Sequence, residues 1–214
     1  MNRWIVIAFL VIVVIVIAYI TGSSLLKPEM KMTQDQAVAL ALEELRYTYH
    51  NATVEIYGTE NDSTVAGEST WKIAARVIYG RNTLCPNLTL VELHYPKFGF
   101  VSREPDTITR DCQVLGCRGT LQCRIDYPEE AVILPLDMAR NPEVQPDMGR
   151  FLDAAGRDTI QAAAAPQPVF TSISNNTYSN VWVATYTAPS LNSTFEVILN
   201  GTTGRALEYY TREK

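Results

Sequence analysis

The sequence is short of the residues and motifs that most enzymes use for catalysis. Its two histidines, His50 and His94, do not lie in a motif with a serine or cysteine nucleophile. The G-x-S-x-G, H-E-x-x-H and P-loop patterns are absent. Calcium loops need dense, alternating oxygen ligands, and the nearest acidic groups are scattered: Asp106, Asp111, Asp126, Glu129 and Glu130. We expect no catalytic residue, no cofactor and no metal site, so the chain is not expected to be an enzyme.

Clusters of positive charge are also missing. The chain has 18 Lys and Arg against 23 Asp and Glu, for a net charge of −5. Runs such as CRGTLQCR and KPEMK are too short to form basic patches. Because a nucleic-acid surface needs clustered Lys and Arg, we expect no nucleic-acid partner.

A long hydrophobic run occupies the start of the chain, with no charge between Arg3 and Lys27. A helix over residues 4–26 would be about 34 Å long, which is enough to cross a bilayer. A cleaved signal peptide is the alternative, but its apolar region is usually shorter. We therefore predict a transmembrane signal anchor over residues 1–26, which would insert into the membrane through residues 4–26. A juxtamembrane linker is predicted over residues 27–32.

Acceptor sequons for N-glycosylation place the rest of the chain outside the cytosol, because they are modified only there. The even number of cysteines also suits an oxidising compartment. We predict a single-pass protein of the cell membrane, a glycoprotein with its C-terminal part extracytoplasmic. The predicted glycosylation sites are Asn51, Asn61, Asn87, Asn175, Asn192 and Asn200.

The four cysteines favour structural disulfides. The spacing C-x4-C-x5-C after residue 111 lacks the close thiolate pairs of zinc sites and the Cys-x-x-Cys of redox sites. If Pro96-Lys97 centres a hairpin, Cys85 lies opposite a position near Cys112. That favours Cys85–Cys112 and leaves Cys117–Cys123 to close a small loop, although the other connectivities stay open.

The first half of the remaining chain predicts a helix followed by about four antiparallel strands. Thr33 and Gln36 form a capping-box pattern ahead of an apolar stripe at helical spacing. STWKIAARVIYG and NLTLVELHY alternate as strands do, and FGFVSR follows the Pro-Lys turn. We assign this module to residues 33–103.

The second half repeats the order of elements, which predicts an internal duplication. A helix is expected over residues 147–165 and is followed by strands, with Trp182 standing where Trp71 stands. The module covers residues 147–214. A Cys- and Pro-rich connector, residues 104–146, separates the modules, and its AVILPL segment is expected to form an edge strand. The predicted fold class is α+β: an N-terminal transmembrane helix followed by two helix-on-antiparallel-sheet modules.

TQDQAVALALEEL, the two Trp-led strands and FEVILNGTTGRALEYY together resemble the PepSY domain family. Two tandem PepSY-like modules are implied, the first divergent because it has YPKFG at the closing turn. The resemblance implies a short helix packed on an antiparallel sheet, and a protein- or peptide-binding role that sometimes includes inhibition of a peptidase. It implies no catalytic residues.

The expected function is therefore a membrane-anchored, extracytoplasmic module that binds a protein or peptide partner, with inhibition of a peptidase as a narrower version. The alternative is a structural component of a cell-envelope or surface assembly, and a hydrolase is a minor alternative. The tryptophans and tyrosines could line a recognition face, but we expect most of them in the core, because sheet faces bury aromatics against the helix.

Overall fold

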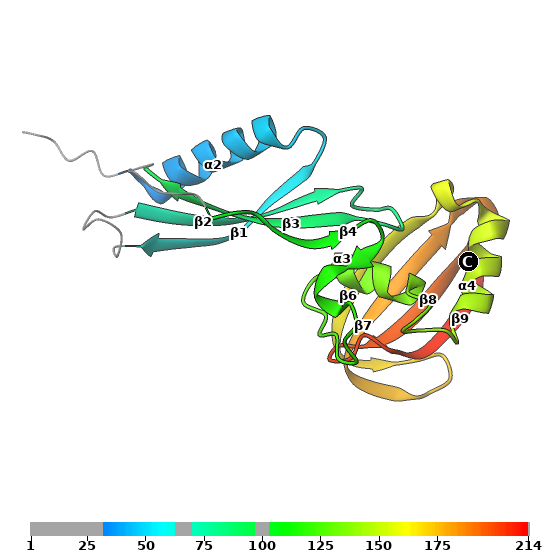
Figure 1. Cartoon of the computed structure of the whole chain (residues 1–214). Coiled ribbons are helices and arrows are strands. Elements are labelled where there is room, and N and C mark those ends of the chain that lie inside the picture. Colours follow the sequence, from blue (N-terminus) through cyan, green and yellow to red (C-terminus); the bar gives the residue numbers. More distant parts are fainter. Residues whose placement is uncertain (1–31, 63–69, 97–102, 214) are drawn as a thin grey trace, which may run out of the picture. The chain divides into compact units, whose positions relative to one another are not determined.

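β-Sheet dominates the computed structural model, which describes residues 32–62, 70–96 and 103–213. Of these residues, 44% lie in strands and 26% in helices. The strands form two antiparallel sheets, ordered β1-β2-β3-β4-β5 and β6-β7-β8-β9. Strands adjacent in the chain are adjacent in the sheet, so each sheet is a simple meander (Figure 1).

The five-stranded sheet carries helix α2 (Gln34–Thr48) along one face (Figure 1). The expected apolar stripe of this helix is confirmed, since Ala41 and Leu45 are buried together with Ala37. They pack on alternate positions of the sheet, where branched and small side chains fill the space under the helix. The strands are β1 (Thr53–Asp62), β2 (Thr70–Tyr79), β3 (Asn87–Tyr95), β4 (Asp106–Arg110) and β5 (Gln113–Val114).

The four-stranded sheet has helix α4 (Gln145–Ala155) along one face (Figure 1). Met148 and Leu152 of this helix are buried in one cluster with Tyr186 and Phe195 of the sheet. The strands are β6 (Gln161–Thr171), β7 (Thr177–Ala188), β8 (Ser193–Asn200) and β9 (Ala206–Glu213). Short 3-10 turns lie at η1 (Leu115–Cys117), η2 (Leu134–Leu136), η3 (Arg157–Thr159) and η4 (Pro189–Leu191).

The expected edge strand AVILPL is instead helix α3 (Pro128–Ile133) continued by η2, so that prediction is wrong. Pro128 suits the first turn of a helix, where its missing N–H costs nothing. The Glu130 carboxylate accepts the backbone N–H groups of Asp126 and Tyr127 at 2.8 and 2.9 Å. From sequence alone, an apolar run that contains a proline is compatible with an edge strand or with a buried helix. The hydrogen bonds at the N-terminus of α3 favour the helix.

The helix expected over residues 147–165 is also partly wrong, because α4 ends at Ala155. Gly156 has φ of +82°, a conformation that stops a helix. The alanine-rich remainder belongs to β6 and pairs with β7. Pro166 and Pro168 lie in the same edge strand, where a missing backbone N–H is tolerated.

The predicted fold class needs correction. The two sheets are not matched copies of one helix-on-sheet module, since they differ in strand number and the four-stranded sheet packs with α3 as well as α4. Within the described ranges, no helix is long and apolar enough to cross a membrane. The predicted anchor lies outside those ranges. The predicted module boundaries, after residues 103 and 146, stay predictions.

Candidate functional site

Both disulfides have the pairing that the hairpin argument favoured. Cys85 is bonded to Cys112, and Cys117 to Cys123, with Cα–Cα distances of 4.6 and 5.0 Å. The register explains the first bond: Leu88 pairs with Thr109 across β3 and β4, which brings the residues before β3 and after β4 together. Strand β4 begins at Asp106, and the expected strand FGFVSR lies almost entirely outside the described residues.

The two histidines and the acidic residues named in the sequence analysis lie on several different elements. His50 is exposed beyond α2, with its ring centroid 5.9 Å from that of Tyr47, whereas His94 lies on β3 opposite Lys72. Glu129 binds the Arg76 guanidinium of β2 at 2.6 Å, and Glu130 holds the start of α3. The three aspartates are exposed: Asp106 begins β4, Asp111 follows its last residue, and Asp126 precedes α3.

The sequon asparagines occupy turns and strand ends. Asn51, Asn175 and Asn192 are exposed at positive φ, a conformation that asparagine tolerates in turns. Asn61 is exposed near the end of β1. The other two are half-buried: the Oδ1 of Asn87 accepts the Asp111 N–H, and that of Asn200 accepts the N–H groups of Thr202 and Thr203. Glycosylation at all six stays a prediction.

The expectation that most tryptophans and tyrosines are core residues holds for only part of them, since Trp71 is half-buried and Tyr57 is 53% exposed. Trp182 and Tyr186 are buried, and the Tyr186 hydroxyl donates to the Val132 carbonyl oxygen at 2.6 Å. Tyr209 is half-buried and stacks on Phe195. These rings therefore form the interior of the four-stranded sheet.

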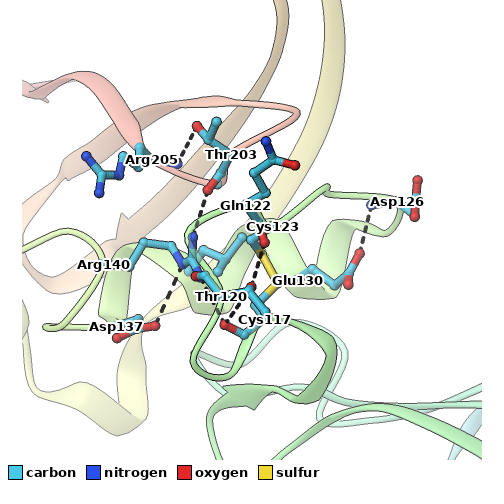
Figure 2. Close-up of a disulfide and its surroundings, with 12 residues drawn as sticks. Cys117, Thr120, Gln122, Cys123, Asp126, Glu130, Asp137, Arg140, Thr203 and Arg205 are labelled. Carbon is cyan, nitrogen blue, oxygen red and sulfur yellow. Dashed lines mark hydrogen bonds and ion pairs between the residues drawn. A yellow bond between two sulfur atoms is a disulfide. The ribbon is translucent and has the colours of Figure 1, made fainter.

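The small loop closed by Cys117 and Cys123 is held in place by one buried arginine. The Arg140 side chain is 7% exposed and donates to the carbonyl oxygens of Cys117, Thr120 and Leu121 at 3.0, 2.8 and 3.2 Å. It also donates to the Thr203 carbonyl oxygen in the β8–β9 turn at 2.9 Å. Figure 2 shows Arg140 reaching between this turn and the loop. The guanidinium thus joins segments far apart in the sequence.

The neighbouring Asn141 reinforces this junction. Its amide is completely buried, donates to the carbonyl oxygens of Leu134 and Gly204, and accepts the Ala206 N–H at 2.8 Å. Ile125 adds a backbone hydrogen bond to Gly201 at 2.9 Å. Since buried polar groups need partners, these complementary bonds fix the segment after the second disulfide onto the β8–β9 turn.

A groove of about 560 Å³ lies against this loop. We call it the disulfide groove. Its lining includes the apolar residues Ile133, Leu134 and Leu136. Two of its residues are strongly exposed, Leu121 at 80% and Met138 at 69%. Leu121 and Met138 line the same groove, and apolar side chains exposed together mark a candidate contact site.

The disulfide groove carries excess positive charge. Arg118, Arg140 and Arg205 line it, and Asp137 is the acidic residue among its lining residues. Asp137 lies 4.0 Å from the Nε of Arg140. The groove is therefore locally positive, whereas the chain as a whole has a net charge of −5.

Sequence reasoning found the loop but missed the groove. The cluster of cysteines pointed to residues 112–123, which include Leu121. Nothing in the sequence links Met138, Arg140 and Arg205 to that loop, because their proximity depends on where α3, η2 and the β8–β9 turn pack. No family model, curated protein or solved structure matches the chain.

Proposed function

We propose that this chain is an extracytoplasmic module that binds a protein or peptide, and that the disulfide groove is its binding site. The observation that carries the proposal is the exposure of Leu121 and Met138 at the groove. An apolar side chain of a partner would remove both from water, and each apolar contact buried in this way favours binding.

The rigidity of the groove supports this role. The Leu121 backbone is pinned by Arg140 and enclosed by a disulfide, so little conformational freedom remains to be lost when a partner binds. The two disulfides also fit an oxidising compartment, which supports the extracytoplasmic location. The resemblance to PepSY domains points to the same class of function.

The alternative, a structural component of a surface assembly, would place the main contact on apolar surface outside the groove. Val169 and Ile173, on the β6–β7 hairpin, are 63% and 58% exposed. They belong to a different element from the disulfide groove and match its two residues in exposure and chemistry. They therefore serve as the control in the test of the proposal.

The test selects binders from a random library of displayed peptides on the oxidised full chain. Affinities of the selected peptides are then measured for the wild type, for Leu121→Ser with Met138→Ser, and for Val169→Ser with Ile173→Ser. We expect the groove variant to lose at least about tenfold in affinity, as truncation of central apolar contacts does, and the hairpin variant to bind normally. Selected peptides that depend on the hairpin and not on the groove would overturn the proposal, as would a selection that yields no groove-dependent peptide.

A further inference from the structure

We infer that the partner segment recognised by the disulfide groove is acidic, with an apolar side chain seated between Leu121 and Met138 and carboxylates held by Arg118 and Arg205. This inference rests on the proposed function and adds the chemistry of the partner. Its basis is the charge of the groove, which is separate from the apolar exposure used above.

Arg118 and Arg205 differ from most arginines of the described chain. Many others form ion pairs with carboxylates of this protein: Arg76, Arg81, Arg110, Arg124, Arg150, Arg157 and Arg212. The Arg118 guanidinium instead bonds the neutral side-chain amide of Gln113. The hydrogen bonds of Arg205 within the described residues involve its backbone: its N–H donates to the Thr203 hydroxyl and its carbonyl oxygen accepts the Asn200 N–H. No ion pair of its guanidinium is found there.

The charge of Arg140, which lines the same groove, is also incompletely neutralised. Its four hydrogen bonds go to carbonyl oxygens, which are uncharged, and its buried Nε lacks a hydrogen-bond partner in the described structure. Asp137 offsets this cation from 4.0 Å. Three cations and one carboxylate thus line the groove, so a carboxylate of a partner would reduce the excess positive charge there.

Arginine suits a carboxylate in particular. Its planar fork donates two parallel hydrogen bonds to the two carboxylate oxygens, a geometry that lysine cannot reproduce. A polypeptide supplies carboxylates and an apolar side chain from one extended segment. A sulfated polysaccharide would satisfy the arginines but leave Leu121 and Met138 in water, so the groove favours a peptide.

The test uses the peptides selected on the oxidised full chain. Their sequences are compared with the unselected library, and the affinity of the best peptide is measured from low to high salt. The variants are Arg118→Ala with Arg205→Ala, and a control of equal charge, Arg110→Ala with Arg150→Ala, in which both arginines are exposed and already paired with aspartates.

We expect Asp and Glu to be enriched beside an apolar residue. The groove variant should lose about tenfold in affinity at low salt and most of its salt dependence, while the control variant changes less than about threefold. Groove-dependent peptides without acidic enrichment would overturn this inference and leave the proposed function standing. Failure to find any groove-dependent peptide would overturn both. Binding of heparin that needs the arginines but not Leu121 and Met138 would show that the partner class is wrong.

Discussion

The Nη1 of Arg140 donates a hydrogen bond to the carbonyl oxygen of Leu121 at 3.2 Å. The buried Arg140 side chain therefore holds the backbone of Leu121, the most exposed of the described large apolar residues. The two side chains point to different environments: Arg140 is 7% exposed and Leu121 is 80% exposed. The stability of the fold and the shape of the disulfide groove therefore depend on the same guanidinium.

Arg140→Lys should lower the free energy of unfolding by about 2–4 kcal/mol, because an ammonium cannot replace hydrogen bonds to four carbonyl oxygens in fixed directions. Urea denaturation of the oxidised protein measures the change. Arg150→Lys, at a side chain that is 79% exposed, is the matched control and should change stability by less than about 0.5 kcal/mol. Equal effects of the two substitutions would contradict the role assigned to Arg140.

The two disulfides should contribute unequally. Cys85–Cys112 spans 27 positions and Cys117–Cys123 spans 6. On the chain-entropy argument, removing the longer link costs about 3.5 kcal/mol and removing the shorter about 2.2 kcal/mol. The Cys117→Ala with Cys123→Ala variant should still fold, yet bind groove-dependent peptides more weakly because the loop loses its closure. Unchanged peptide binding by this folded variant would show that the loop does not need the bond.

Gly204→Ala should be more destabilising than Gly119→Ala, although both glycines have positive φ, +64° and +67°. A Cβ at Gly204 would lie 2.9 Å from Cδ1 of the buried Leu134, whereas nothing lies within 4 Å of one at Gly119. We expect about 3 kcal/mol for the first, from strain and overpacking together, and about 1 kcal/mol for the second, from backbone strain alone. Comparable losses would argue against tight packing of the β8–β9 turn on Leu134.

Glu130 should give a measurable pH dependence. Burial raises the pKa of its carboxyl above the ordinary 4.5, so the folded state binds its proton more tightly than the unfolded state does. This contribution to stability is therefore greatest in acid and declines as pH rises from about 4.5 through the raised pKa.

The measurement is urea denaturation of the wild type and of Glu130→Gln from about pH 4 to about pH 7. A carboxyl group with a raised pKa titrates in this range. The glutamine variant keeps an acceptor for the N–H groups of Asp126 and Tyr127 but does not titrate. Relative to the wild type, it should gain stability as pH rises. A stability difference that stays constant or moves the other way would contradict the assignment.

The spacing of apolar residues in the sequence predicted several of the regular elements of the fold. The helical stripe at Ala41 and Leu45 and the strand NLTLVELHY are found where they were expected, because periodicity reports which face is buried. The pairing of Cys85 with Cys112 was also predicted, because the register of two antiparallel strands determines which residues lie opposite each other along them.

The errors arose where tertiary packing overrode local preference. Alanines 162–165 have high helix propensity, yet they pair with β7 after the break at Gly156. AVILPL is apolar enough for a strand, but its burial on all sides and its N-terminal hydrogen bonds make it helical. The disulfide groove could not be foreseen, because Arg140 meets Thr203 across a separation of 63 residues.

The central claim is that the disulfide groove binds a polypeptide segment, and the most direct test is to map that segment by amide chemical shifts. The oxidised, isotope-labelled chain is titrated with the tightest peptide from the library selection. We predict that the largest shifts fall on residues 118–121 and 136–140, with smaller ones near Arg205. Shifts concentrated on an edge strand such as β6, with the groove amides unmoved, would contradict the account.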